Sequence, residues 1–258
     1  MRRSSSWRLA MFLALVAACG TQDKPADAPA DQAPAAAGPA AIVTVIYKHP
    51  TDTAAFEKYY REVHLPLVSA NQHEIGFTRA DLTKFISKLD GSKAPLYRQA
   101  ELYFPSMDAA KKGMATPGFK KVADDLANFA SGGLIGMLAE ETSEPTEAST
   151  GEPMAVLAVI YVQPKEPPAF EKYYAETHVP LVGASQAEIG FTKAELTKFA
   201  SSLEGSVPGY YRQAELYFPS IEALKKGVET EAFKKVAADL PNFATGGGPH
   251  VLVAVETR

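Results

Sequence analysis

Two stretches of the chain carry the same succession of apolar and polar positions, and the first shows its period clearly. Residues 42–47 form a β-branched apolar run, which predicts a strand. From residue 56 to residue 67 apolar side chains recur every three or four positions, as on one face of a helix. Pro66 disfavours helical geometry at the residue before it, so this helix is expected to end near His64.

The pattern then predicts a strand at 75–85, a strand at 96–104, two short helices and a last strand at 134–140. Ser106 and Thr116 stand where N-cap residues belong, because each precedes a helical period and can accept a hydrogen bond from a free backbone N–H. The resulting order, βαββαβ, is that of a ferredoxin-like unit.

This unit occurs twice in the sequence. When the chain is shifted by 114 residues, about 58 of the 92 positions in 42–133 are identical without a gap. Identity at this level over one long unit indicates a tandem duplication rather than a solenoid of many short repeats.

Each copy would place two helices on one face of a four-stranded sheet and leave the other face apolar and uncovered. Exposed apolar surface costs roughly 25 cal/mol per Å², so two such sheets in one chain are expected to cover each other. We therefore predict an α+β fold in which two ferredoxin-like βαββαβ repeats pack sheet to sheet as an intrachain dimeric α/β barrel. Such a protein would be a monomer with an internal pseudo-dimer, with helices outside and a cavity between the sheets.

The N-terminal segment has a different composition. Residues 1–19 combine three arginines, about ten consecutive apolar residues and small residues before Cys19, which is the layout of a secretory signal peptide. The end of this segment resembles a bacterial lipobox, so Cys19 is the predicted lipidation site. A lipid there would anchor the protein to a membrane of the cell envelope, on the outer membrane or facing the periplasm of a Gram-negative host. A cleaved, fully secreted protein is the alternative.

Two further segments lack apolar periodicity and predict linkers. The expected organisation is a signal peptide at 1–19, an Ala/Pro-rich linker at 20–41, a first repeat at 42–141, a linker at 142–153 and a second repeat at 154–258.

The composition and the motifs of the chain exclude several classes of partner and cofactor. The 258 residues include 26 Lys and Arg against 30 Asp and Glu, which gives a net charge of -4, and a single cysteine. This balance argues against nucleic acid as a partner. The sequence has no phosphate-binding glycine loop, no HExxH and no GxSxG, so neither a cofactor nor a metal is predicted.

The third strand of each copy alternates between apolar and polar side chains. Ala100, Leu102 and Phe104 share one face, which is expected to lie under the helices. The residues expected to face the barrel interior and to contact a ligand are Tyr97, Gln99 and Glu101, with Tyr211, Gln213 and Glu215 in the second copy. Alternatively, Glu101 forms an ion pair with an arginine or lysine or lies at the rim, because buried carboxylates are usually paired.

His64 and His178 are the candidate catalytic residues. Each ends a predicted first helix on its inward stripe, one turn after Tyr60 or Tyr174. Imidazole exchanges protons near neutral pH, and the neighbouring tyrosine would position the ligand. Alternatively, each histidine hydrogen-bonds the free carbonyls at a helix C-terminus.

Three segments give a family resemblance. The first runs from Phe56 to Leu67 and contains Tyr59-Tyr60 and His64-Leu-Pro66; the others are residues 100–104 and 125–129, Asp-Leu-Ala-Asn-Phe. Together they closely resemble the EthD family, named for ethyl tert-butyl ether degradation, and the second copy resembles it equally well. The resemblance implies a dimeric α/β barrel associated with oxidation of small organic compounds and, in related barrels, with cofactor-free rearrangements. The chain departs from the usual single-copy intracellular form of the family because it is duplicated and carries a lipobox-like segment.

These features favour a protein that binds or converts a small organic molecule in the barrel cavity, by oxidoreductase-related or cofactor-independent proton-transfer chemistry. Two alternatives remain, a non-catalytic envelope binding protein and a structural lipoprotein with a filled barrel. A cavity of roughly a few hundred Å³ would favour a ligand site over the structural alternative.

Overall fold

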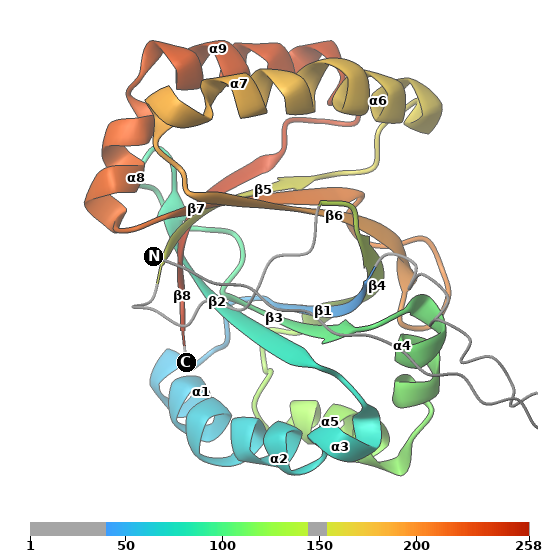
Figure 1. The fold of residues 1–258 in the computed structure, drawn as a ribbon. Helices are drawn as coiled ribbons and strands as arrows, with labels where there is room; N and C mark the ends of the chain where they lie inside the picture. Colours follow the sequence, from blue (N-terminus) through green and yellow to red (C-terminus); the bar gives the residue numbers. More distant parts are fainter. Residues whose placement is uncertain (1–39, 144–153, 258) are drawn as a thin grey trace, which may run out of the picture. The chain divides into compact units, whose positions relative to one another are not determined.

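Eight strands of the described residues close into one barrel, in the order β1-β3-β2-β8-β5-β7-β6-β4 (Figure 1). The computed structural model describes residues 40–143 and 154–257; the predicted signal peptide, Cys19 and most of both predicted linkers lie outside these residues. The strands are β1 (Ala41–Tyr47), β2 (Arg79–Lys88), β3 (Arg98–Phe104), β4 (Leu134–Glu141), β5 (Ala155–Tyr161), β6 (Lys193–Ser202), β7 (Arg212–Phe218) and β8 (His250–Glu256).

Each repeat contributes four neighbouring strands, and the two sets join along two seams. Strand β2 pairs with β8, and β4 pairs with β6, both antiparallel. The seams leave no unpaired sheet edge, which removes the tendency of exposed strands to pair with other chains. The prediction of two ferredoxin-like repeats that form an intrachain α/β barrel is therefore confirmed, and the barrel is hydrogen-bonded all the way round.

Helices cover the outside of each half of the barrel (Figure 1). In repeat 1 they are α1 (Thr53–Tyr59), η1 (Tyr60–His64), α2 (Leu65–Ala70), α3 (Gln72–Ile75), α4 (Met107–Met114), α5 (Pro117–Asp125) and η2 (Leu126–Asn128). In repeat 2 they are α6 (Pro167–Tyr173), η3 (Tyr174–His178), α7 (Val179–Ile189), α8 (Ile221–Val228), α9 (Glu231–Asp239) and η4 (Leu240–Asn242). The side chains of Ser106 and Thr116 cap α4 and α5, as predicted. In residues 40–143 and 154–257, no helix is long and apolar enough to cross a membrane.

The prediction that the first helix ends near His64 is wrong. The helix passes through a single π-helical turn, η1, in which the N–H of Leu65 bonds the carbonyl of Tyr60, five residues back. Proline lacks an N–H and its ring clashes with the preceding turn of an α-helix. The wider π turn accommodates Pro66 at the start of α2, so the helical path continues to Ile75.

The second strand accordingly begins later than predicted. The expected range 75–85 starts on the last residue of α3, whereas β2 starts at Arg79. Gly76 ends the helix in the left-handed conformation, with φ of 84°. The alternation of this segment was weak because its first residues belong to the helix and its C-cap.

The apolar core has separate layers inside and outside the barrel. One cluster fills the interior between the two halves and includes Ile42, Phe85, Val156 and Phe199, all almost completely buried. Four further clusters of described residues lie between the sheet and the helices, two in each repeat. Both faces of β1 and β5 are therefore covered, which explains their nearly continuous apolar sequences.

Candidate functional site

Two cavities lie between the helices and the outer face of the sheet, one in each repeat. The repeat-1 cavity has a volume of about 260 Å³ and the repeat-2 cavity about 390 Å³. Their walls are mainly apolar, and both are of the size that takes a small organic ligand. The predicted cavity between the two sheets is therefore misplaced, because the barrel interior holds an apolar cluster and a network of polar side chains instead.

His64 lies on the wall of the repeat-1 cavity and is held by a carboxylate. Its Nδ1 lies 2.8 Å from Oδ2 of Asp125, at the end of α5. The other oxygen, Oδ1, accepts hydrogen bonds from the hydroxyl of Tyr59 at 2.8 Å and from the amide of Asn128 at 3.0 Å. The ring of His64 also stacks on Tyr60, with centroids 5.7 Å apart. The proposed helix-capping role of the histidine is wrong, because η1 continues into α2.

The electrostatics of this pair define its protonation. Burial lowers the pKa of His64, and the attraction of Asp125 only partly opposes this effect. Burial would raise the pKa of Asp125, but hydrogen bonds from His64, Asn128 and Tyr59 outweigh it and lower that pKa. Asp125 is therefore ionised and can only accept, so Nδ1 of the neutral imidazole carries the hydrogen. Nε2 is left with a free lone pair, which is the form that a general base needs.

Repeat 2 contains the same arrangement. Nδ1 of His178 lies 2.8 Å from Oδ2 of Asp239, whose other oxygen accepts the hydroxyl of Tyr173 at 2.7 Å. Burial lowers the pKa of His178 as well. The hydroxyl of Tyr161, which also lines the cavity, lies 3.5 Å from Nε2 and donates to it, so Nε2 is the acceptor nitrogen of this ring. The duplication has therefore kept two histidine–aspartate pairs, each on the wall of its own cavity.

The tyrosines predicted beside the histidines also line the cavities. Tyr60 belongs to the repeat-1 wall and Tyr174 to the repeat-2 wall. Within the described part of the chain, the buried hydroxyl of Tyr60 has no hydrogen-bond partner. Burial raises the pKa of Tyr60, and that of Tyr174 to about 12, so both hydroxyls stay protonated at neutral pH. The hydroxyl of Tyr60 is therefore a protonated donor that no described side chain uses.

Tyr97 and Tyr211 do not face the barrel interior, contrary to the prediction, and they line neither cavity. Tyr97 precedes β3, and its hydroxyl donates to Glu57 at 2.6 Å on the helical side of the sheet. Glu57 also accepts a two-point hydrogen bond from Arg98, at 3.1 and 2.7 Å. Burial opposes ionisation of Glu57, but these partners and Lys84 lower its pKa to about 2. This cluster is a structural connection between the first helix and the third strand.

Gln99, Glu101, Gln213 and Glu215 do face the barrel interior, as predicted. The side-chain amide of Gln99 donates to Oε1 of Glu215 at 3.3 Å, across the two repeats. Glu101 accepts a hydrogen bond of 3.5 Å from Thr44. Because the histidines lie outside the barrel and these residues inside it, the structure separates two sets that were expected around one cavity.

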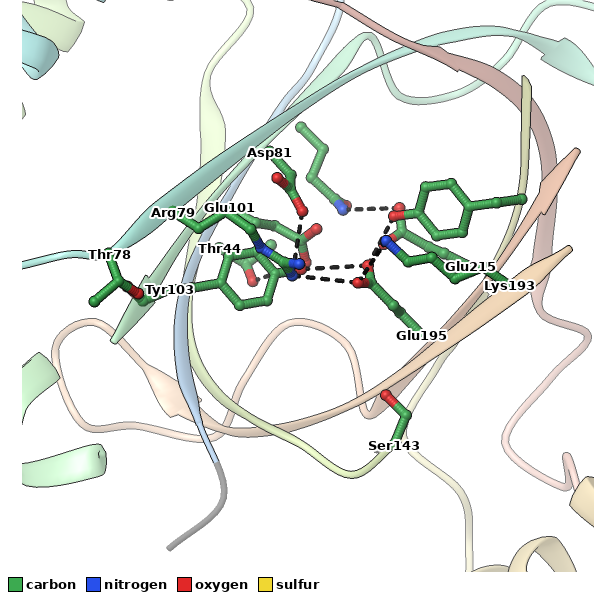
Figure 2. A network of polar contacts seen from close by, with 12 residues as sticks. Thr44, Thr78, Arg79, Asp81, Glu101, Tyr103, Ser143, Lys193, Glu195 and Glu215 are labelled. Carbon is green, nitrogen blue, oxygen red and sulfur yellow. Dashed lines mark hydrogen bonds and ion pairs between the residues drawn. The ribbon is translucent and has the colours of Figure 1, made fainter. Parts of the chain in front are cut away.

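Figure 2 shows the polar network that occupies the barrel interior. Glu195 is its centre: it forms ion pairs with Arg79 at 3.2 Å and Lys193 at 2.9 Å, and it accepts the hydroxyl of Tyr217 at 2.8 Å. Arg79 also pairs with Asp81 at 3.3 Å and lies over the ring of Tyr103. The cations of the network thus pair with Asp81 and Glu195.

Glu101 and Glu215 experience a different environment from Glu195. Burial raises the pKa of Glu101, and the nearby carboxylate of Glu215 raises it further. Burial also raises the pKa of Glu215, to about 8, with the charge of Glu195 as the next cause. The alternatives for Glu101, an ion pair or a place at the rim, are wrong, because its side chain is fully buried and its neighbours are mainly carboxyls. These two groups are expected to hold protons at neutral pH.

Sequence reasoning missed Asp125 and Asp239, which hold the histidines. Both occur in the Asp-x-x-Asn-Phe segment that carries part of the family resemblance, and the asparagine and phenylalanine also contact the site. The segment recurs 114 residues later. The presence of the segment in both copies was a signal that it has a role. Its contact with His64 could not be predicted, because His64 lies 61 positions earlier and no helical period relates the two residues.

The candidate site offers no metal ligand set. In residues 40–143 and 154–257, no three His, Cys, Asp or Glu side chains gather as a group that could hold a metal ion. The cavity walls instead combine apolar side chains with a histidine–aspartate pair and tyrosine hydroxyls. This arrangement suits binding of an apolar molecule with one polar end and transfer of a proton at that end.

Comparison with known proteins agrees with this architecture. The fold is similar to that of an anthrone oxidase-like protein, with 15% identity over 86% of this chain and 93% of that one and a TM-score of 0.57. It is also similar to a candidate monooxygenase from Fusobacterium nucleatum, with 12% identity over 85% and 95% of the two chains and a TM-score of 0.54. These similarities define the fold class, the dimeric α/β barrels.

The family follows from the sequence. The EthD domain model matches twice, at residues 48–133 and 163–247, so the chain belongs to the EthD-domain family. An uncharacterized 11.0 kDa protein from the thcB–thcC intergenic region of Rhodococcus erythropolis is 37% identical over 99 residues, which are 38% of this chain and 92% of that protein. The whole of such a single-domain relative therefore corresponds to one of the two repeats.

Proposed function

We propose that each repeat binds a small, mainly apolar organic molecule in its helix–sheet cavity and transfers a proton at the molecule's polar end. The observation that carries this proposal is the buried, neutral histidine whose Nδ1 is fixed by an aspartate and which lies on the wall of a mainly apolar cavity. The oxidoreductase-like names of the structural neighbours are consistent with such chemistry, because removal of a proton prepares many phenols and ketones for oxidation.

The polar atoms of the wall define the ligand class. Tyr60 supplies a protonated hydroxyl without a partner among the described residues, and His64 supplies an acceptor nitrogen. A matching ligand carries an oxygen that accepts from the tyrosine and an acidic hydrogen that the imidazole can take. Phenols, and ketones that convert to phenols by losing a C–H proton, have both features.

The proton transfer needs no further reactant. Nε2 of His64 takes the C–H proton of such a ketone, and the electron pair of that bond moves to the carbonyl oxygen. The hydroxyl of Tyr60 stabilises the developing negative charge, and Asp125 stabilises the imidazolium through Nδ1–H. Return of the proton to oxygen gives the phenol, whereas return of a solvent proton to carbon gives isotope exchange.

Anthrone is a suitable probe because it is a ketone of this kind and its name occurs in that of a structural neighbour. We expect the purified protein to accelerate exchange of the anthrone methylene hydrogens in D₂O, followed by proton NMR. The variant with both His64→Gln and His178→Gln should lose the acceleration, with circular dichroism unchanged. His73→Gln is the matched control, since His73 is exposed on α3 and lines neither cavity.

The binding-only alternative has a distinct outcome in the same experiment. A protein that merely captures anthrone would show saturable binding by titration calorimetry without acceleration of exchange. Acceleration that survives in the double variant would show that the histidines are not the bases. A protein that neither binds anthrone or a phenol nor accelerates exchange would contradict the proposal altogether.

We propose further that the protein acts from a membrane surface of the cell envelope, anchored through a lipid on Cys19. The support is the lipobox-like sequence around Cys19 and the Pro-rich composition of the segment after it. A tether to a membrane would concentrate the protein where apolar molecules partition.

A further inference from the structure

Each cavity is completed by a leucine from the other repeat. Leu203, in the turn after β6, lines the repeat-1 cavity, and Leu89, in the turn after β2, lines the repeat-2 cavity. The two positions are equivalent, because they lie 114 residues apart. The seams explain the exchange: β6 pairs with β4 of repeat 1 and β2 pairs with β8 of repeat 2, so each strand ends against the opposite half.

The two leucines meet different residues. Gly136 on β4 lies opposite Val45, and Val251 on β8 lies opposite the equivalent Val159, so Gly136 and Val251 correspond to each other. A Cβ atom placed on Gly136 would lie only 2.5 Å from Cδ1 of Leu203. Leu203 therefore occupies the space that a side chain at position 136 would need, and its N–H also bonds the Gly136 carbonyl at 3.2 Å.

In repeat 2 this space is already filled. The side chain of Val251 packs in the helix–sheet layer and lines the cavity itself. Leu89 remains 37% exposed, whereas Leu203 is packed against the repeat-1 core. The glycine thus lets one leucine reach the core of the opposite repeat, and the valine keeps the other nearer to the surface.

Other wall positions also differ in size. Leu65 and Ser69 of repeat 1 correspond to the smaller Val179 and Gly183 of repeat 2. Leu157 on β5 is larger than the equivalent Val43 of repeat 1, so this difference alone would make the repeat-2 cavity smaller. The net result is the larger cavity in repeat 2, about 390 Å³ against about 260 Å³.

We propose that the two repeats have different ligand-size limits, with repeat 2 taking the larger molecule, and that the contact of Leu203 with Gly136 sets the limit in repeat 1. This inference rests on the proposed function, because it assumes that both cavities bind apolar ligands. Leu203 and Gly136 act on size alone, since neither belongs to the histidine–aspartate pair.

The test uses 4-alkylphenols of increasing chain length, measured by titration calorimetry on the full chain. Val68→Phe fills the repeat-1 cavity and Val182→Phe the repeat-2 cavity at equivalent positions, so each variant leaves one cavity open. Each methylene that is accommodated should raise the affinity about fourfold, until the chain exceeds the cavity. The protein with only the repeat-1 cavity should reach its limit at a shorter chain than the protein with only the repeat-2 cavity.

Gly136→Val should then move the repeat-1 limit toward that of repeat 2, because the new side chain displaces Leu203. Leu203→Ala should also lengthen the longest alkyl chain that repeat 1 accepts. It tests the same contact if Gly136→Val does not fold. In both variants the ratio of the affinity for long homologues to the affinity for short homologues should rise.

The size inference would be overturned if the two single-cavity proteins accepted the same longest alkyl chain. It would also be overturned if neither Gly136→Val nor Leu203→Ala changed the longest chain that repeat 1 accepts. Both outcomes would leave the proposed function intact. If no alkylphenol binds to either cavity of the wild-type protein, the proposed function fails and this inference fails with it.

Discussion

Replacing Glu215 by glutamine should stabilise the protein at alkaline pH. Glu215 and Glu101 are buried together in the barrel interior, and burial raises the pKa of both carboxyls, that of Glu215 to about 8. Between the pKa of an unfolded glutamate, about 4.3, and that value, the unfolded chain has lost the proton while the folded chain retains it. The free energy of unfolding must therefore decrease as pH rises through this window.

The size of the effect follows from the shift. One pKa unit corresponds to about 1.4 kcal/mol, so the pKa of Glu215 sets an upper limit on the order of 5 kcal/mol at pH 8 and above. Because structural relaxation and water penetration reduce burial penalties in real proteins, we expect about 2 to 4 kcal/mol. Glutamine keeps the oxygen that accepts from Gln99 and carries no charge, so it avoids the cost of proton uptake.

Urea unfolding followed by circular dichroism at pH 4.5, 6 and 8 would measure this difference. Glu215→Gln should match the wild type within about 0.5 kcal/mol at pH 4.5 and exceed it increasingly toward pH 8. Glu204→Gln, in the exposed turn after β6, is the control and should have no such trend. A variant that gains no stability relative to the wild type between pH 4.5 and pH 8 would refute the reasoning, because the pKa of Glu215 would then not be raised in the folded protein.

Four further outcomes are expected. Asp125→Asn combined with Asp239→Asn should lower the anthrone exchange rate at least about 100-fold with little change in fold, because asparagine does not fix the proton on Nδ1; binding of anthrone and circular dichroism are the controls. The exchange rate of the wild type should persist below pH 6.5 and decline only in more acidic buffer, because burial lowers the pKa of both histidines; a midpoint above pH 6.5 would contradict the site's electrostatics. Glu57→Ala should lower the free energy of unfolding by about 2 to 4 kcal/mol, since Arg98 would remain buried without its carboxylate, whereas Glu62→Ala on the exposed helix face should change it by less than about 0.5 kcal/mol. Cys19→Ser should abolish incorporation of labelled palmitate in a bacterial host and release the protein from the membrane fraction; unchanged labelling would show that Cys19 is not the lipidation site.

The order of strands and helices could be predicted because local patterns dominate it. The run that became β1, the N-caps Ser106 and Thr116 and the repeat at 114 residues each depend on neighbours in sequence. The closed barrel followed from the need to cover two apolar sheet faces. What local rules could not reveal was the π turn before Pro66, because one extra residue per turn offsets the clash that proline normally causes.

The site was harder to predict because its parts meet through tertiary packing. Alternation along β3 correctly placed Glu101 inside the barrel, but Tyr97 precedes the strand and lies on the helical side with Glu57. The sequence pattern predicts an inward position for both the histidines and the glutamates, but it does not distinguish the two faces of the sheet. In a barrel with helices outside, a helix residue such as His64 can only face the outer surface of the sheet, so the two groups lie on opposite sides of it.

The contrast between Gly136 and Val251 has a consequence for how such a barrel can change over time. When two identical subunits form the barrel, every mutation alters both cavities at once, and a change that suits one ligand is imposed on the other site as well. When both halves are encoded in a single gene, a mutation alters one cavity and leaves the other cavity unchanged and functional. The covalent fusion therefore permits divergence of specificity within one molecule, a step that a symmetric homodimer cannot take.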